Sequence, residues 1–208
     1  MKKWEGFEVL SQYAGQRTKE FKLITEERKV QLNRLAKAVR LDLDLECSAD
    51  LVFICTHNSR RSHMGQVWAL LAAYYYEIIG IRCFSGGTEA TAFNPRAVNA
   101  LEMTGLEIEQ LDDGSNPEYM LSFPGEEEGF RAFSKKYEDP PNPTKDFIAV
   151  MTCSAADEAC PVVTGASSRH SITYEDPKDY DGTPEEEVKY DERSRQIARE
   201  MFYLFSRV

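Results

Sequence analysis

The strongest constraint on the fold of this chain is the alternation of short apolar runs with stretches of helical period. Residues 51–55, LVFIC, form a continuous apolar run of the kind that is buried on both faces of a parallel sheet. Apolar residues then recur at helical spacing from Met64 to Ile78. Three further strands are predicted, at 81–87, 147–153 and 170–176. Strands that alternate with helices pair in parallel, so the sequence predicts a three-layer α/β/α fold around a central parallel four-stranded sheet.

Capping residues mark the starts of two predicted helices. Asn94 is followed by Pro95, the order of an N-cap and a first helical residue. The last helix is predicted to begin at the capping box Thr183-Pro184-Glu185-Glu186. Its apolar face is predicted to consist of Ile197, Met201, Leu204 and Phe205. A short helical segment, SAADEAC, is expected after the strand 147–153.

Residues 1–49 are predicted to be a helical N-terminal extension of a main domain formed by residues 50–208. Thr25 is placed as the N-cap of a long helix. That helix carries a single apolar stripe, formed by Leu32, Leu35, Ala36 and Val39. We therefore expect the stripe to pack on the main domain, with a homodimer through the N-terminal helices as the alternative.

Residues 112–146 differ in composition from the rest of the main domain. They are rich in Pro, Gly, Glu and Asp, which is typical of loops. We expect a long surface insertion here, with a hairpin between 119–123 and 129–137.

Composition and cysteine usage narrow the function classes. The chain has 208 residues and a formal net charge of −10, which repels polyanions, so no nucleic-acid partner is expected. No apolar stretch approaches the roughly 20 residues of a membrane span, and the first lysines lack the apolar core of a signal peptide. We therefore expect a cytoplasmic protein without a membrane partner. Five cysteines without a C-x2-C pair argue against a disulfide framework and a structural zinc site, and no cofactor or metal is predicted.

The turn after the strand 51–55 is polar and basic. Ligands of open α/β sheets bind beyond the carboxyl ends of strands, which is where Cys55 stands. We expect the backbone N–H groups that follow to hold a tetrahedral oxyanion, with Arg61 as a planar fork for two of its oxygens. The same donors, with the Ser62 hydroxyl, favour a Cys55 thiolate at neutral pH, and the Asn58 side chain is expected to brace the loop. The alternative is a buried, inert thiol. The predicted oxyanion-binding residues are Thr56, His57, Asn58, Ser59, Arg60, Arg61 and Ser62.

A carboxylic acid is expected at a second strand end. Asp176 closes the predicted strand 170–176 and precedes Pro177, which keeps it extended. Such an acid can protonate a leaving oxygen and later activate water. A turn-forming Asp-Pro pair is the alternative, and Asp179 and Asp181 are nearby substitutes.

The order of these motifs resembles the low-molecular-weight protein tyrosine phosphatase superfamily, and more closely its thioredoxin-coupled arsenate reductases. The superfamily signature is a strand, Cys-x5-Arg-Ser and a helix near the start of the domain, with Asp-Pro near its end. The matching stretches here are CTHNSRRSHMGQ, FSGGTEATAFNPRAV, VMTCSAADEACP and YEDP. They span residues 51–208 and leave residues 1–50 and 112–146 outside the resemblance.

The resemblance implies one of two reactions at Cys55. In a reductase, Cys55 would attack arsenate and Cys153 would then attack the Cys55 sulfur, expelling arsenite. Cys160 would attack Cys153 and leave a disulfide for thioredoxin to reduce. Seven residues of helix would hold the two Cα atoms about 10 Å apart, beyond the roughly 7 Å limit for a disulfide, so the segment must unwind on oxidation. In a phosphatase acting on phosphotyrosine or a small phosphate ester, Cys55 is the nucleophile, Asp176 is the general acid and the other two thiols stay reduced.

Two positions depart from the reductase pattern. Arg60 stands where the reductases often carry a second cysteine or a small residue, which adds a positive charge to the loop. Gln66 stands where many relatives have a carboxylate near a bound cation, which argues against a cation site. A third interpretation is a catalytically silent oxyanion-binding or interaction module. Of the three, we carry the arsenate reductase forward as the working hypothesis.

Overall fold

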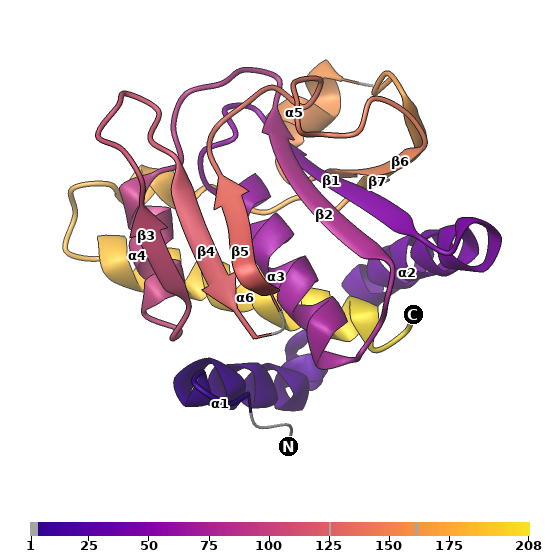
Figure 1. Ribbon diagram of the computed structural model, residues 1–208, viewed down its shortest axis with the longest axis horizontal. Coiled ribbons are helices and arrows are strands. Elements are labelled where there is room, and N and C mark those ends of the chain that lie inside the picture. The colour runs from indigo at the N-terminus through magenta and orange to yellow at the C-terminus, as the bar shows by residue number, and fades with distance from the viewer. Residues whose placement is uncertain (1–3, 125, 161) are drawn as a thin grey trace.

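Four parallel strands form the central sheet of the computed structural model, which describes residues 4–124, 126–160 and 162–208 (Figure 1). Their order across the sheet is β2–β1–β6–β7. The bounds are Ala49–Cys55 for β1, Ile81–Gly87 for β2, Phe147–Met151 for β6 and Ala166–Ser171 for β7. All residues of β1 are buried, as expected of an apolar strand in the middle of a parallel sheet. The predicted α/β fold with a four-stranded parallel sheet is confirmed.

Helices cover both faces of this sheet. On one face, α3 (Arg61–Tyr75) and α6 (Glu186–Phe205) pack over Phe53 and Val150 in one core. On the other face, the short helix α5 (Ser154–Ala159) covers Ile54 and Met151. A further helix, α4 (Pro95–Glu102), contacts α6 and starts at Asn94, whose side chain accepts the Arg96 N–H as the predicted cap. None of the helices in the described ranges has the length and apolar content that a membrane span needs.

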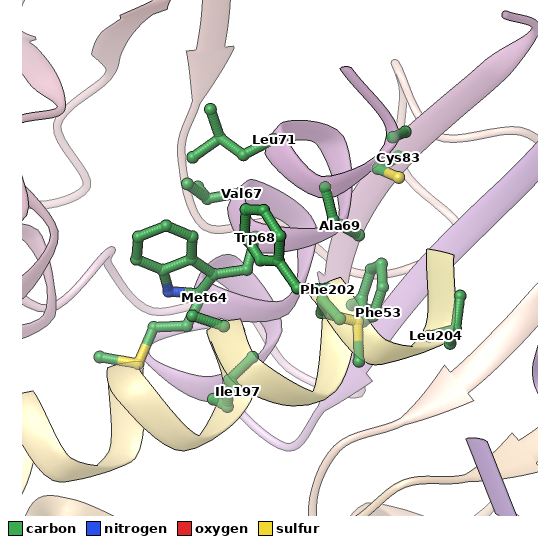
Figure 2. Packing of buried hydrophobic residues seen from close by; sticks show 14 of the residues in the cluster. Phe53, Met64, Val67, Trp68, Ala69, Leu71, Cys83, Ile197, Phe202 and Leu204 are labelled. Atoms are coloured by element: carbon green, nitrogen blue, oxygen red, sulfur yellow. The ribbon is translucent and has the colours of Figure 1, made fainter. Parts of the chain in front are cut away.

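The core between α3, α6 and β1 sets the position of the chain after Cys55. Figure 2 shows the Phe53 ring, the Trp68 indole and Phe202 packed together between these elements. The Trp68 Nε1–H donates to the Ser194 hydroxyl on α6 at 3.0 Å. At Gly65 a Cβ atom would stand 2.5 Å from the Phe53 ring, so the glycine lets α3 lie directly on β1. This close approach fixes the start of α3, and with it the loop that joins β1 to α3.

A second, antiparallel sheet of order β3–β4–β5 lies beside the central one (Figure 1). It consists of β3 (Glu107–Gln110), β4 (Tyr119–Phe123) and β5 (Glu126–Ala132). The β4–β5 pair is the hairpin that was expected within residues 112–146. Tyr119, Leu121 and Phe123 are buried in the main core, so this segment contributes to the interior and is not only a surface insertion.

Several predicted boundaries differ from the structure. The strand expected at 147–153 is β6, which ends at Met151, so Cys153 lies after the strand. The strand expected at 170–176 is β7, which ends at Ser171, so Asp176 does not close a strand. Asp176 instead caps the 3-10 helix η2 (Pro177–Tyr180) by accepting the Lys178 N–H, and Pro177 itself has no N–H to donate to a neighbouring strand. The last helix starts at Glu186 rather than directly after Thr183. The Thr183 hydroxyl donates to the Tyr180 carbonyl and accepts the Glu185 N–H, so it holds the turn before the helix.

The N-terminal residues form α1 (Glu8–Arg17), η1 (Thr18–Leu23) and α2 (Glu26–Glu46). Thr25 caps α2 as predicted, since its hydroxyl accepts the Arg28 N–H. The predicted apolar stripe of α2 is buried in the core that it shares with α6, and its members are Leu32, Leu35, Ala36 and Val39. The stripe therefore packs on the rest of its own chain, which is the first of the two arrangements that we expected for it.

We predict that Leu35→Ala lowers the free energy of unfolding by about 3 kcal/mol, because it removes a fully buried side chain and leaves a cavity between α2 and the rest of the core. Leu41→Ala on the same helix is the matched control, since Leu41 is 56% exposed. It should change stability by less than about 0.5 kcal/mol. Urea unfolding of both variants makes the measurement, and equal effects would contradict the burial of the stripe.

Candidate active site

The loop between β1 and α3 curls around Asn58, which has a left-handed backbone (φ 44°). Asparagine adopts this conformation more readily than most residues. Its side chain makes two hydrogen bonds: Nδ2 donates to the Ser62 hydroxyl at 2.8 Å, and Oδ1 accepts the Lys135 N–H at 2.9 Å. Asn58 thus braces the loop as expected, and it also joins the loop to the segment after β5.

All backbone carbonyls of the loop point outward into hydrogen bonds. The carbonyls from Cys55 to Arg60 accept, in order, from Thr88 N, Glu89 N, Ser134 Oγ, His63 Nε2, Asn94 N and Met64 N. In the ranges that the structure describes, no acceptor is paired with the backbone N–H groups of 56–60. A loop whose carbonyls face away and whose amides are unused has the form of an anion-binding nest.

Cys55, the residue from which this loop starts, is 4% exposed, and its sulfur contacts the first turn of α3. The sulfur stands 3.1 Å from the Ser62 hydroxyl oxygen. Because that oxygen already accepts a hydrogen from Asn58 Nδ2, the Ser62 hydrogen is available for the sulfur. Gly87 passes alongside, and a Cβ there would stand 2.7 Å from both the Asn58 nitrogen and the Thr56 oxygen, so only glycine fits beside the loop.

Arg61 and Asp176 meet beside the nest, although they are far apart in the sequence. One Arg61 nitrogen, Nη2, donates to Asp176 Oδ2 at 2.5 Å, and Nη1 donates to the Tyr174 carbonyl at 2.9 Å. The third nitrogen, Nε, is buried and has no partner among the described residues. Two hydrogen bonds therefore fix the guanidinium in one orientation, and among the described residues its Nε–H is left without an acceptor.

The Arg60 side chain contacts groups outside the loop, including Asp176, whose Oδ1 lies 3.9 Å from Arg60 Nε. Its Nε donates to the Tyr190 hydroxyl at 2.7 Å and its Nη2 to Asp181 Oδ2 at 3.3 Å. Tyr190 in turn donates to Asp181 Oδ1, and burial, followed by that contact, raises the pKa of Tyr190 to about 12. The Arg60 side chain therefore links the loop to α6 and to the segment after Asp176, while its backbone stays in the nest. Of the predicted oxyanion-binding side chains, that of His57 is half-exposed and lies 3.7 Å from Glu89, and Ser59 is buried.

His63 is a functional residue that sequence reasoning missed. It is fully buried, stacks on Phe93 and approaches the Asn58 carbonyl with Nε2 at 3.0 Å. Since a carbonyl only accepts, Nε2 carries the proton, and Nδ1 is left to accept from the Ser85 hydroxyl at 3.2 Å. Burial, and next the nearby Lys135 ammonium, lower the pKa of His63 well below its ordinary value. A neutral imidazole therefore supports the bend at Asn58.

Cys153 and Cys160 stand at the two ends of α5. The Cys153 sulfur is 3.5 Å from the Thr56 hydroxyl, so it lies against the nest, and it accepts the Ala156 N–H as the helix N-cap. Cys160 is the C-cap and is partly exposed. Both thiols are free, with the turns of α5 between them, as the sequence predicted.

Comparison with solved structures identifies the class of fold. The fold is similar to a low-molecular-weight phosphotyrosine phosphatase from Vibrio cholerae, with a TM-score of 0.51 and 12% identity over 76% of this chain and 95% of that one. It is also similar to an arsenate reductase in a phosphate-binding state, with a TM-score of 0.50, 17% identity and coverage of 76% and 97%. The chain has the fold of the low-molecular-weight phosphotyrosine phosphatase superfamily, which confirms the resemblance read from its motifs.

Sequence comparison adds a more particular relationship. Distant relatives are named arsenate reductase in Bacillus licheniformis, Halalkalibacterium halodurans and Bacillus subtilis, at 27%, 28% and 26% identity. The alignments cover 75%, 65% and 70% of this chain and 94%, 79% and 86% of the relatives. No model of a known protein family matches the chain. The relatives are thus enzymes that act on an oxyanion, as their name states.

We predict that His63→Gln flattens the pH dependence of stability. The pKa of His63 lies below its ordinary value of 6.5 in the folded state, so the unfolded chain binds more protons on acidification. Stability from this group is therefore complete above about pH 6.5 and is lost as the pH falls below it. Between about pH 7.5 and about pH 5.5 the wild type should lose about 1.4 kcal/mol more than the variant. Denaturant titrations at both pH values measure this, and equal losses would show that His63 is not held neutral.

Proposed function

We propose that this protein is an arsenate reductase in which Cys55, Cys153 and Cys160 act in series. The observation that supports this most directly is the place of Cys153, whose sulfur lies 3.5 Å from the Thr56 hydroxyl at the edge of the nest. A phosphatase of this fold needs one thiol, and a second thiol against the loop, although it also caps α5, suits a relay in which it attacks the first. The distant relatives named arsenate reductase favour the same function.

The proposed reaction begins at Cys55. Its thiolate attacks arsenic, water leaves, and a thiol-bound arsenate ester forms in the nest of free amides beside Arg61. The Cys153 thiolate then attacks the Cys55 sulfur, so that the S–As electron pair reduces arsenic(V) to arsenic(III) and arsenite leaves. Cys160 attacks the Cys153 sulfur, which frees Cys55 as a thiolate. A reduced dithiol protein, thioredoxin in this proposal, reduces the Cys153–Cys160 disulfide.

The attack of Cys160 on Cys153 requires α5 to unwind, and the structure of α5 suits that requirement. The helix spans six residues, of which only Ala156 is buried, so little apolar surface is exposed when it opens. Its main outside support is Arg169, which donates to the Asp157 carboxylate and carbonyl, both at 2.6 Å, and to the Cys160 carbonyl at 3.1 Å. These hydrogen bonds are part-buried. Water can therefore replace them around Arg169 when α5 opens, which keeps the cost of opening low.

The charges around the nest explain how an acidic protein can bind arsenate. The net charge is −10, yet Arg61 and the N-terminus of α3 present positive charge to the nest. Asp176 offsets Arg61 and is placed to exchange a proton with a leaving or attacking oxygen. A relay of free thiols also needs a reducing compartment, so we place the protein in the cytoplasm.

We predict that Cys55→Ser, Cys153→Ser and Cys160→Ser each abolish turnover in arsenate-dependent NADPH oxidation coupled through thioredoxin and its reductase. The expected loss is at least about a thousandfold, because each step needs its own sulfur. Cys47→Ser is the matched control, since Cys47 is an exposed cysteine at the end of α2, and it should keep full activity. Wild-type rates in Cys153→Ser or Cys160→Ser would contradict the relay.

A phosphomonoesterase is the second candidate, favoured by the contact between Asp176 and Arg61 beside Cys55. It would hydrolyse an aryl phosphate with Cys55 as nucleophile and Asp176 as general acid. The same variants separate the two functions: Asp176→Asn and Cys55→Ser would abolish hydrolysis, whereas Cys153→Ser would leave it unchanged. Binding of phosphate with no turnover in either assay would indicate an oxyanion-binding module.

A further inference from the structure

Arg28 of α2 makes three side-chain hydrogen bonds, two of which join the N-terminal helices to α6 and to the segment after β7. Its Nε donates to Glu200 Oε2 on α6 at 2.8 Å, and its Nη2 donates to the Thr173 backbone carbonyl at 2.7 Å. Its Nη1 donates to Gln31 Oε1 at 2.9 Å, so every nitrogen of the guanidinium has an acceptor. The guanidinium carbon also lies over the Tyr174 ring, 4.8 Å from its centre. These contacts give the Arg28 side chain one fixed position.

The ion pair between Arg28 and Glu200 is shielded from solvent. The two side chains are 15% and 3% exposed. The other Glu200 oxygen, Oε1, accepts from Gln196 Nε2 at 3.1 Å, so both oxygens of the carboxylate are engaged. Removing one partner of a buried ion pair leaves an uncompensated charge, and the pair therefore resists separation. Through Arg28 the Thr173 carbonyl is attached to a well-held part of the core.

Thr173 immediately precedes the groups that orient Arg61. The Tyr174 carbonyl accepts from Arg61 Nη1 at 2.9 Å, and Asp176 Oδ2 accepts from Arg61 Nη2 at 2.5 Å. The same segment is joined to the end of β6, because the Tyr174 N–H donates to the Thr152 carbonyl at 3.1 Å. Residues 172–176 belong to neither a helix nor a strand, so contacts of this kind set their position. Arg28 provides such a contact one residue before the first acceptor of Arg61.

We propose that Arg28 is a positioning residue for the oxyanion site. By holding the Thr173 carbonyl, it keeps the Tyr174 carbonyl and Asp176 in the places from which they fix the Arg61 guanidinium. The N-terminal helices, which lie outside the family resemblance, thus contribute to the site as well as to the core. This role rests on the proposed oxyanion nest, but it does not depend on which reaction follows there.

The double variant Arg28→Met/Glu200→Met tests this role, because it removes the Thr173 donor without leaving a buried charge unpaired. Replacing a buried ion pair by apolar side chains often leaves stability unchanged or raises it. The affinity for inorganic phosphate, measured by titration calorimetry, should fall at least about fivefold, the effect of one lost hydrogen bond. Lys29→Met is the matched control, because it removes a positive charge at the next position of α2, where Lys29 pairs with the exposed Glu26. It should change the affinity by less than about twofold.

Two further measurements separate positioning from a general loss of structure. In an Arg61→Lys background, the double variant should weaken phosphate binding by less than about a further twofold, because its effect passes through the Arg61 fork. The Arg61 Nε–H resonance, which is identified by its absence from the spectrum of Arg61→Lys, should shift in the double variant. The same resonance should keep its position in Lys29→Met. General loosening of the fold would not act through a single side chain.

Unchanged phosphate affinity in a folded double variant overturns the proposal, as does an equal loss in Lys29→Met, which would be an effect of net charge. If the double variant fails to fold, as judged by its melting temperature, Arg28→Lys decides by the same measurements. Its single ammonium can pair with Glu200 but lacks the fork that also reaches Thr173. A wild type that binds no phosphate would contradict the nest itself and this role with it, so the two failures are distinguishable.

Discussion

The hydrogen bonds of Asn58 hold the oxyanion loop in its curled form, and the chemistry of the site depends on that shape. Asn58 takes a left-handed backbone conformation, bonds Ser62 with its amide nitrogen and accepts the Lys135 N–H with its amide oxygen. Its backbone carbonyl accepts a hydrogen bond from His63 Nε2, so both the side chain and the carbonyl of Asn58 hold the bend in the loop. Within the described ranges the backbone N–H groups of residues 56–60 have no hydrogen-bond partner, and the Ser62 hydrogen is left for Cys55. One residue thus links the shape of the loop to the surroundings of the Cys55 sulfur.

Much of the fold could be predicted because its signals are local. A continuous apolar run before a polar, basic turn placed β1 and Cys55, and the cap residues Thr25 and Asn94 placed two helix starts at the observed positions. The strand-end rule led us to expect Asp176 near the site, but Asp176 follows β7 at a distance and its pairing with Arg61 was not predicted. The strand before Asp176 was placed too late in the sequence, because Ile172 and Tyr174 are buried beyond the end of β7 and imitate a strand pattern.

The supports of the nest could not be predicted, because they come from distant parts of the chain. Lys135 is 77 positions from Asn58, and Tyr190 is 130 positions from Arg60. His63 gave no signal, because a histidine in the first turn of a helix has the same local pattern whether it faces solvent or the interior. Residues 112–146 have the composition of a surface loop, yet Ser134 and Lys135 of this segment bond to His57 and Asn58 in the loop after β1. Such contacts are properties of the assembled fold.

The central claim is that the loop presents Cys55 as the nucleophile of an anion-binding nest, and the rate of its alkylation tests this directly. An ordinary thiol is almost entirely protonated at about pH 6, so Cys47, which is exposed, serves as an internal standard in the same chain. Mass spectrometry after brief treatment with iodoacetamide at that pH should show Cys55 modified faster than Cys47, despite its burial, and protected by inorganic phosphate. Slower modification of Cys55 than of Cys47, or a rate that phosphate does not change, would contradict the account.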